Sequence, residues 1–384
     1  MTERADRSLP CSPRPDAPRD RPIKRPDKGP DKGPKTMSHI MIRHLPALLL
    51  ALLCPLAAAA QEGVASFGEG DTEITLRSTT DIAIIRPLIE RFTATNPDLS
   101  VHYEQWGSNN LFTNSRAACD GRAEPADALL SSGAHQMLWL VNAACARPYR
   151  SPATEALPEQ RRWRDELWGI TEEPAVIIYN TEALDAEDVP RTRFALLDLM
   201  RKKPELLRSR IATYDIEDSG LGYLFAHADS LEATTFGAML EAFSRIGAIA
   251  TCCSLSIIEG VSEGRYYIAY NVLGSYAEAR AAENVGIILP EDYTLMMTRS
   301  FVIPRNAPHP EAAQRLLDFL LSPPAQEMLR ELGLIAASDP AETSLLPSAR
   351  RLISLSPPLL LALDRSTRER LFRLWDEAFS ADAG

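Results

Sequence analysis

The sequence lacks the motifs by which many catalytic and metal-binding sites are recognised. It contains no His-Glu-x-x-His, no Cys-x-x-Cys and no phosphate-binding loop. These absences argue against a zinc protease, a structural zinc site and a P-loop nucleotidase. The chain also has no internal repeat and no apolar run long enough to span a bilayer comfortably.

Positive charge is scarce. The chain carries 41 Lys and Arg residues against 52 Asp and Glu residues, a formal net charge of −11. Nucleic acid selects basic surfaces, so this balance argues against a nucleic-acid partner. It does not exclude a small anionic ligand, because the charge of a local site can oppose the net charge.

The N-terminus is predicted to lie outside the folded part. Residues 1–40 are rich in Pro, Arg, Lys and Asp, which predicts a disordered extension. We also expect that this extension results from a start codon assigned too far upstream. Residues 41–60 combine basic Arg43, an apolar run and the small residues Ala58-Ala59-Ala60, the pattern of a cleavable signal peptide. We therefore expect export to the periplasm and a mature chain that begins at Gln61 and is even more acidic.

Four cysteines remain after residue 60: Cys119, Cys145, Cys252 and Cys253. An exported protein can form disulfides. The sequence leaves open whether Cys119 pairs with Cys145 and whether the adjacent Cys252 and Cys253 pair.

Strand-like and helix-like segments alternate along the chain. Ile74–Ser78 is a short predicted strand, Asp81 is placed to cap a helix with apolar residues at helical spacing, and Leu99–Trp106 is the next strand. The same alternation continues through 126–132 and 210–216. It predicts an α/β protein with largely parallel sheets flanked by helices.

One stretch, "RIATYDIEDSGLGYLFAHAD" (210–229), indicates a binding function. A predicted strand runs through Ser219-Gly220-Leu221-Gly222 into a helix. Free backbone N–H groups and the helix dipole at such a helix start favour an anion, and glycine allows its close approach.

The order of several segments resembles one family. These segments are "ITLRSTTD", "ADALLSS", "WGITEEPAVIIYN", "TYDIEDSGLGYLFA", "GRYYIAYNVLGSYAEA" and the region from "LPEDYTLMMTRSFVIP" to "LLSPPAQEML". Over 74–333 the chain resembles periplasmic solute-binding proteins of ABC transporters, in the iron(III)-type branch. Within that branch it is most similar to phosphoglycerate transport regulatory binding proteins.

The resemblance implies a two-lobed type II periplasmic binding protein fold with two crossing segments. We expect lobe I in 70–172 and 277–340, lobe II in 173–276, and a C-terminal helical tail in 341–384. The ligand would lie between the lobes, outside the carboxyl ends of the strands. The lobes would close over it by hinge motion.

The expected ligand-binding residues are small and polar and follow strand ends. Hydroxyl and backbone N–H groups at such places suit an anionic solute. For Asp81 we favour helix capping over binding. The binding candidates are Ser78, Thr79, Thr80, Ser131, Ser132, Ser219, Gly220, Gly222, Asn271, Ser275 and Tyr276.

The sequence does not identify which cationic side chain would pair with the anion. Arg77, Arg191, Arg193 and Arg299 are the cationic candidates, because guanidinium binds carboxylate and phosphate through paired hydrogen bonds. Iron(III)-binding relatives carry adjacent metal-ligating tyrosines where this chain has Ser275 and a lone Tyr276. The adjacent pair, Tyr266 and Tyr267, lies earlier in the sequence.

These observations predict a monomeric binding protein without a cofactor, a metal or a catalytic residue. It would pass a small organic anion, phosphorylated or carboxylated, to ABC transporter membrane subunits or present it to a membrane sensor kinase. The alternatives are a ferric-iron carrier and a periplasmic enzyme that uses Cys252 or Cys253 as a nucleophile.

Overall fold

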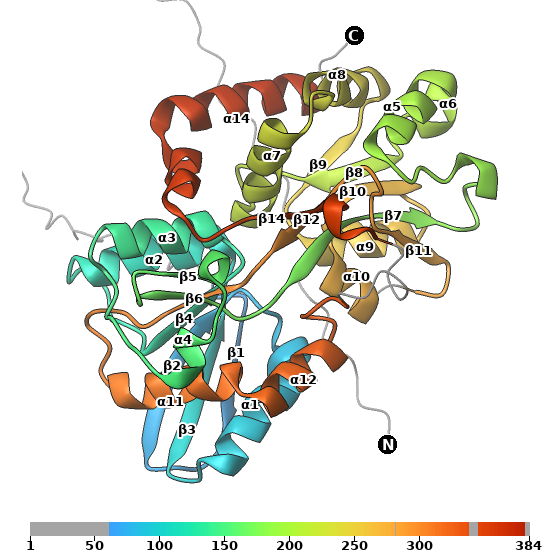
Figure 1. The fold of residues 1–384 in the computed structure, drawn as a ribbon. Helices are drawn as coiled ribbons and strands as arrows, with labels where there is room; N and C mark the ends of the chain where they lie inside the picture. Colours follow the sequence, from blue (N-terminus) through green and yellow to red (C-terminus); the bar gives the residue numbers. More distant parts are fainter. Residues whose placement is uncertain (1–60, 281, 338–344, 381–384) are drawn as a thin grey trace, which may run out of the picture. The chain divides into compact units, whose positions relative to one another are not determined.

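The structure is a computed structural model that describes residues 61–280, 282–337 and 345–380 (Figure 1). The predicted extension in 1–40 and the predicted signal peptide in 41–60 lie outside these residues. Within the described ranges, no helix combines the length and apolar character needed to cross a membrane.

The first lobe is built on a seven-stranded sheet with the order β1-β3-β2-β4-β13-β6-β5. β2 pairs in parallel with β3 and β4, and the remaining neighbours are antiparallel. The strands are β1 (Gly63–Phe67), β2 (Thr72–Ser78), β3 (Leu99–Gln105), β4 (Ala128–Ser131), β5 (Arg162–Trp163), β6 (Leu167–Gly169) and β13 (Ser300–Val302).

The second lobe is built on another seven-stranded sheet, with the order β14-β12-β7-β10-β8-β9 and with β11 also paired to β7. The pairs β10–β8, β8–β9 and β12–β14 are parallel. The strands are β7 (Glu173–Asn180), β8 (Ile211–Tyr214), β9 (Ile249–Thr251), β10 (Ile268–Leu273), β11 (Val285–Ile288), β12 (Thr294–Met297) and β14 (Arg350–Leu352).

Helices flank both sheets (Figure 1). Those that precede β7 or lie between β13 and β14 in the chain are α1 (Ile82–Thr95), α2 (Ser108–Cys119), α3 (Ala134–Asn142), α4 (Pro152–Glu155), α11 (Pro310–Leu321) and α12 (Pro323–Glu331). The others are α5 (Arg193–Lys202), α6 (Pro204–Leu207), α7 (Gly220–Glu232), α8 (Phe236–Ile246), α9 (Ser254–Ser262), α10 (Gly274–Arg280) and α14 (Arg365–Phe379).

The predicted fold class, two sheets flanked by helices, is confirmed. The sheets are mixed rather than largely parallel, however. β7 runs antiparallel to β10, β11 and β12, and β13 runs antiparallel to β4 and β6. The reason is connectivity: β7 carries the chain out of the first lobe and β13 brings it back, so each runs against neighbouring strands.

Helix α1 shows how well local patterns set the elements. Its predicted apolar positions Ile84, Leu88 and Phe92 are buried. The Asp81 side chain caps the helix by accepting the N–H of Ala83 at 2.8 Å. An apolar stripe with a capped start therefore forms the expected helix against the sheet.

Other boundaries differ from the expectation. β11 and β12 pair with β7 in the second sheet, which contradicts the expectation that all of 277–340 belongs to the first lobe. The helix that begins after Ser219 ends at Glu232, and a second helix, α8, follows it after residues 233–235. The expected helical tail begins instead with β14 and a 3-10 helix, η4 (Pro357–Leu363). Two consecutive prolines, Pro357 and Pro358, lack N–H donors for a continuous α-helix.

The C-terminal segment, residues 345–380, contacts both lobes. Its strand β14 extends the second sheet, and the Leu355 N–H then donates to the Gln160 carbonyl beside β5 at 2.8 Å. Further on, Trp375 donates from its indole to the Tyr214 carbonyl, and Leu371 and Trp375 join the core of the second lobe. The segment is therefore a third connection between the lobes.

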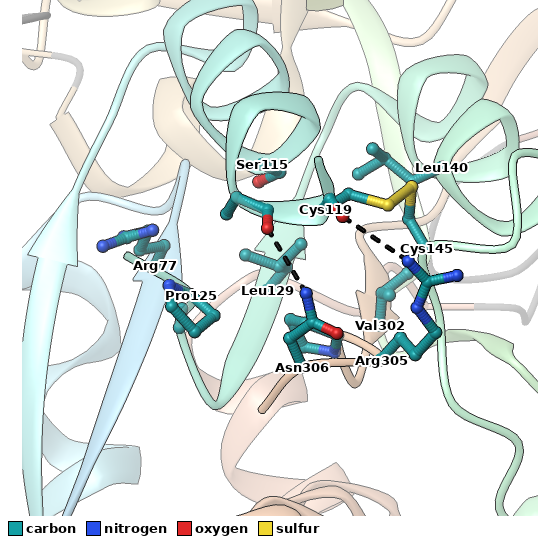
Figure 2. Close-up of a pocket in the computed structure, with 13 residues that line it drawn as sticks. Arg77, Ser115, Cys119, Pro125, Leu129, Leu140, Cys145, Val302, Arg305 and Asn306 are labelled. Atoms are coloured by element: carbon teal, nitrogen blue, oxygen red, sulfur yellow. Dashed lines mark hydrogen bonds between the residues drawn. A yellow bond between two sulfur atoms is a disulfide. The ribbon is translucent and has the colours of Figure 1, made fainter. Parts of the chain in front are cut away.

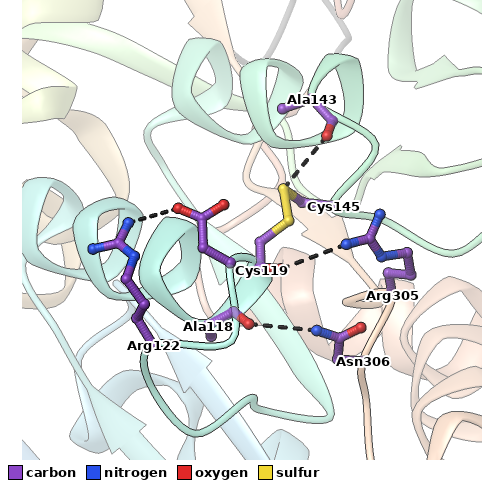
Figure 3. Close-up of a disulfide and its surroundings, with 8 residues drawn as sticks. Ala118, Cys119, Arg122, Ala143, Cys145, Arg305 and Asn306 are labelled. Atoms are coloured by element: carbon purple, nitrogen blue, oxygen red, sulfur yellow. Dashed lines mark hydrogen bonds and ion pairs between the residues drawn. A yellow bond between two sulfur atoms is a disulfide. The ribbon is translucent and has the colours of Figure 1, made fainter.

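The disulfide left open by the sequence forms between Cys119 and Cys145, with Cα atoms 5.4 Å apart (Figure 3). It joins the last residue of α2 to the loop that follows α3. The carbonyls of Ala118 and Cys119 accept hydrogen bonds from Asn306 and Arg305 on the segment after β13. The disulfide therefore holds α2 and α3, which contribute to the site described next, at one end of the first sheet.

Candidate functional site

The first-lobe part of the site is made by the loops after β2 and β4, whose ends are tied together. Thr79 Oγ1 lies 3.1 Å from Ser132 Oγ and accepts the Ser132 N–H at 2.9 Å. The Thr79 N–H donates to the Leu130 carbonyl at 3.0 Å. Because the two strands are parallel neighbours, their carboxyl ends bring these hydroxyl groups to one edge of the sheet.

Two predicted serines in these loops stabilise their own turns. Ser78 Oγ accepts the N–H of Thr80, and Ser131 Oγ accepts the N–H of Gly133, each two residues ahead. Both serines are fully buried. Thr80 is also fully buried, and within the described chain its Oγ1 has no hydrogen-bond partner. The geometry therefore assigns turn stabilisation to Ser78 and Ser131.

The start of α1 meets the second lobe at Tyr276. The Asp81 N–H donates to the Tyr276 phenolic oxygen at 2.8 Å, and Arg280 on the same helix α10 lies 3.2 Å from the Asp81 carboxylate. Burial raises the pKa of Tyr276, so the phenol is neutral at physiological pH. It takes part as a hydrogen-bonding group rather than as an anion.

A buried ion pair lies behind these loops, close to both crossing strands. Arg299 donates from Nε to Glu173 at 2.9 Å, and both side chains are at most 1% exposed. Burial acts to lower the pKa of Arg299, but the neighbouring Glu173 holds it above its usual value. Ser275 donates to the same carboxylate, and Arg299 Nη1 reaches the Thr79 carbonyl at 3.3 Å. Arg299 is thus the predicted cation that contacts the site.

The second-lobe part of the site is the start of α7, which is in direct contact with α2. Ser219 Oγ caps α7 by accepting the Gly222 N–H at 3.0 Å. The Gly220 N–H donates to Ser108 Oγ of the first lobe at 3.0 Å. A Cβ at Gly220 would lie 2.7 Å from Gln136 Nε2 and 2.9 Å from Ser108 Oγ. Glycine here allows the lobes to approach closely.

Three residues of this contact were not predicted: Ser108, Asn109 and Gln136. Asn109 Nδ2 donates to the carbonyls of Glu217 at 2.8 Å and Asp218 at 3.0 Å, and its Oδ1 accepts from Gln136 Nε2 at 2.7 Å. The sequence does carry a signal for two of them. "GSNN" follows β3 after one residue and spans the start of α2, the same strand-to-helix position as the other predicted residues.

Asn271 lies apart from the other predicted residues, in a buried network of the second lobe. Its Nδ2 donates to Asp229 at 2.6 Å, and the phenols of Tyr270 and Tyr293 donate to the same carboxylate. Arg193 lies 3.2 Å from Asp229. Asn271 has a positive φ of 56°, at a bulge in β10. The network joins α7 to β10 and to the start of β12.

The remaining arginine candidates have other contacts. Arg77 binds Glu104 at 2.7 Å inside the first lobe and lines a cavity of about 20 Å³ next to the disulfide (Figure 2). That volume suits a single water rather than an organic solute. Arg193 belongs to the Asp229 network, and Arg191 is exposed beside Glu291.

Side chains suited to metal binding or covalent chemistry are not brought together in the described residues as the hydrogen-bonding groups above are. Among the described residues, no group of three or more His, Cys, Asp or Glu side chains converges to hold a metal ion. Tyr266 and Tyr267 precede the first residue of β10, at the end opposite to Tyr276. Cys253 is a free, exposed thiol whose pKa is raised by partial desolvation, which disfavours the reactive thiolate.

One sequence pattern found in many hydrolases, Gly-x-Ser-x-Gly, occurs at 260–264. In the nucleophile elbow of hydrolases such a serine sits at a strand-to-helix turn. Here Ser262 is the last residue of α9 and donates from Oγ to the Ile258 carbonyl at 3.0 Å. The pattern therefore forms an ordinary helix end.

Residues 77–327 match the family described as Bacterial extracellular solute-binding protein, over more than half of the chain. A curated relative, Iron uptake protein A1 of Synechocystis sp., is 27% identical over 275 residues. That alignment covers 67% of this chain and 74% of the relative.

Solved structures give the same result for the fold. The substrate binding protein of an ABC transporter from Agrobacterium tumefaciens is 31% identical, with a TM-score of 0.78, and the match covers 84% of this chain and all of that one. The periplasmic binding protein AfuA from Actinobacillus pleuropneumoniae, solved with fructose-6-phosphate, is 14% identical with a TM-score of 0.62. That match covers 81% of this chain and all of AfuA.

Proposed function

The chain belongs to the family of bacterial extracellular solute-binding proteins, and we propose that it captures a small organic anion between its two lobes. The anion would be phosphorylated or carboxylated, as a phosphoglycerate is. Members of this family are binding proteins that work with ABC transporter membrane subunits. We propose no catalytic step for this chain.

One observation carries the choice of ligand: neutral hydrogen-bonding groups of the second lobe meet the first lobe at the loops after β2 and β3, next to the loop after β4. Thr79 and Ser132 supply hydroxyl groups, Tyr276 a neutral phenol, and Gly220 a backbone N–H at a helix start. Arg299 adds positive charge behind them. Such a set suits the oxygens of a phosphate or carboxylate group.

The same contacts between the lobes explain how a bound ligand would close them. The N–H of Gly220 and that of Asp81 now bind Ser108 and Tyr276 across the lobes. A bound anion would replace these partners and accept from both lobes at once. The ligand would then stabilise the closed form by its differential affinity for that form.

We propose a periplasmic location and a monomeric state. The family works outside the cytoplasm, and the predicted signal peptide in 41–60 supports cleavage before Gln61. The liganded protein would deliver its solute to the membrane subunits of an ABC transporter or engage a membrane sensor kinase.

A ferric-iron carrier is the second candidate, favoured by the name of the Synechocystis relative. The tyrosine arrangement supports the organic anion instead. The adjacent Tyr266 and Tyr267 stand at the far end of β10, whereas the phenol beside the site, Tyr276, is kept neutral by burial.

Thermal unfolding of the purified protein tests the proposal against phosphoglycerates, small carboxylates, fructose-6-phosphate and ferric iron. A ligand at 100 times its Kd should add about 2.7 kcal/mol to the free energy of unfolding. Stabilisation by a phosphorylated or carboxylated anion supports the proposal. Stabilisation by ferric iron alone, with a metal-dependent visible absorbance, would replace it with the iron carrier.

A further inference from the structure

A cavity of about 270 Å³ is lined on one side by helices α2 and α3 of the first lobe. The start of α7 and the C-terminal segment line the other side. We propose that this cavity binds a small aromatic carboxylate, as a site additional to the proposed solute site. The residues of its wall that the argument uses are Phe112, Arg116, His135, Tyr223, Arg368 and Phe372.

The cationic groups of the cavity come from two elements far apart in the sequence. Arg116 lies on α2, and its guanidinium carbon is 4.8 Å from the centre of the Trp139 ring. Arg368 lies on α14, 5.2 Å from the centre of the Phe372 ring. In the described part of the chain, neither guanidinium forms an ion pair or a side-chain hydrogen bond. Two exposed guanidinium groups beside one cavity provide a binding place for a carboxylate.

The aromatic side chains of the wall provide a place for a ring. Phe112 and Phe372 are each partly buried, and Tyr223 packs edge-on against Phe372 with centroids 5.5 Å apart. A cavity of this size is many times larger than a single water requires, so it has room for a small organic molecule. Aromatic rings beside placed polar and charged groups, the Glu217 carboxylate among them, are typical of sites for small organic molecules.

A buried donor or acceptor without a partner adds an independent observation. His135 is 1% exposed, and within the described residues its Nδ1 has no hydrogen-bond partner. Burial and the nearby His227 and Arg368 lower the pKa of His135 to about 3, so the ring is neutral and can carry its proton on Nδ1. A ligand oxygen would supply the acceptor that this nitrogen lacks.

The cavity adjoins the proposed solute site without coinciding with it. The Asn109–Gln136 contact and the start of α7 form its wall on that side. None of Thr79, Ser132 and Tyr276 lines it. A carboxylate bound by both Arg116 and Arg368 would link α2 of the first lobe to α14 of the C-terminal segment.

Isothermal titration of the full chain with benzoate tests the proposal, with Arg116→Gln and Arg368→Gln as variants. Both side chains are exposed, so both variants should fold, and each should weaken benzoate binding at least tenfold because each removes a charge-assisted hydrogen bond. The control is Arg365→Gln on the same helix; Arg365 pairs with Glu369 and lies outside the cavity wall. It should leave the affinity unchanged.

Benzyl alcohol has a ring without a negative charge, and inorganic phosphate has a negative charge without a ring. Each should bind more weakly than benzoate. Absence of benzoate binding up to millimolar concentration would overturn the proposal. So would benzoate binding that survives both Arg116→Gln and Arg368→Gln but is lost in Ser219→Asp, because the ligand would then occupy the solute site. Phosphoglycerate binding measured in the same variants separates this proposal from the proposed function, since it should not depend on Arg368.

Discussion

At the scale of single residues, the serine at the start of α7 combines a structural and a binding role. Its hydroxyl caps the helix by accepting the Gly222 N–H. Aspartate is an equally good N-cap, so Ser219→Asp should keep the helix start while it places a negative charge beside the proposed anion. We expect the affinity for a stabilising anion to fall about tenfold or more.

Titration calorimetry checks this result, with Ser322→Asp as the matched control. Ser322 also caps a helix, α12, and accepts the Ala325 N–H away from the solute site. Equal affinity in wild type and folded Ser219→Asp would remove Ser219 from the binding site.

The Glu173–Arg299 pair is a second residue-scale feature, because both side chains are almost fully buried. Glu173→Gln would leave the guanidinium without its counter-charge. We expect a loss of about 3–5 kcal/mol in the free energy of unfolding, measured by urea denaturation.

Adding Arg299→Met to Glu173→Gln supplies the control for this pair. The double variant should lose much less than the sum of the single losses, because no unpaired charge remains buried. Additive losses would show that the two side chains stabilise the fold independently.

At the scale of elements, the Cys119–Cys145 disulfide fixes the ends of α2 and α3 across a sequence separation of 26. Closing a loop of that length contributes about 3.5 kcal/mol in the chain-entropy description. The double variant Cys119→Ala/Cys145→Ala should unfold at lower denaturant concentration by a corresponding amount. Wild type in reductant should behave similarly, and a variant as stable as oxidised wild type would contradict the expectation.

The contact between α3 and α7 should make stability depend on pH. His135 is buried against the Tyr223 ring, with centroids 5.5 Å apart, and its pKa is lowered from the usual 6.5 to about 3. Between these values the unfolded chain binds a proton that the folded chain does not, so stability rises with pH and is lost as the pH falls. This histidine contributes a slope of about 1.4 kcal/mol per pH unit within the window.

Denaturation of wild type and His135→Phe across pH 4 to 7 measures that slope. The variant keeps an aromatic ring but cannot titrate, so its stability should change less with pH. Parallel curves would show that folding does not lower the pKa of this imidazole.

The elements also show which parts of the fold can be read from sequence. Helix α1 was predictable because its cap, apolar spacing and Asn96 end act locally. β14 was not, because Arg350–Leu352 has no local strand pattern and becomes a strand by pairing with β12. In the site, polar residues after strands indicated Thr79 and Ser132. Gln136 was missed because its contact with Asn109 depends on how two helices meet.

At the scale of the whole molecule, direct hydrogen bonds between the lobes set how readily the protein closes. Asn109 of the first lobe holds the carbonyls of Glu217 and Asp218 in the second. Asn109→Ala should shift the unliganded protein toward an open form with a larger radius of gyration. Solute affinity should then fall in proportion to the lost closed population.

Small-angle scattering with and without solute tests this expectation. Asn114→Ala is the control in the same helix, because Asn114 accepts a hydrogen bond from Arg77 inside the first lobe. A radius unchanged in Asn109→Ala would mean that these bonds do not determine closure.

The central position of β13 in the first sheet has a consequence for the order in which the protein is made. β13 lies between β4 and β6, yet it is synthesised after the β7–β12 strands of the second sheet. While the ribosome is still producing the residues before Ser300, β13 is missing. The edges of β4 and β6 that pair with β13 in the folded protein are then unpaired. The first lobe therefore completes its sheet late, and its unfinished edges must be protected from other chains until Val302 has emerged.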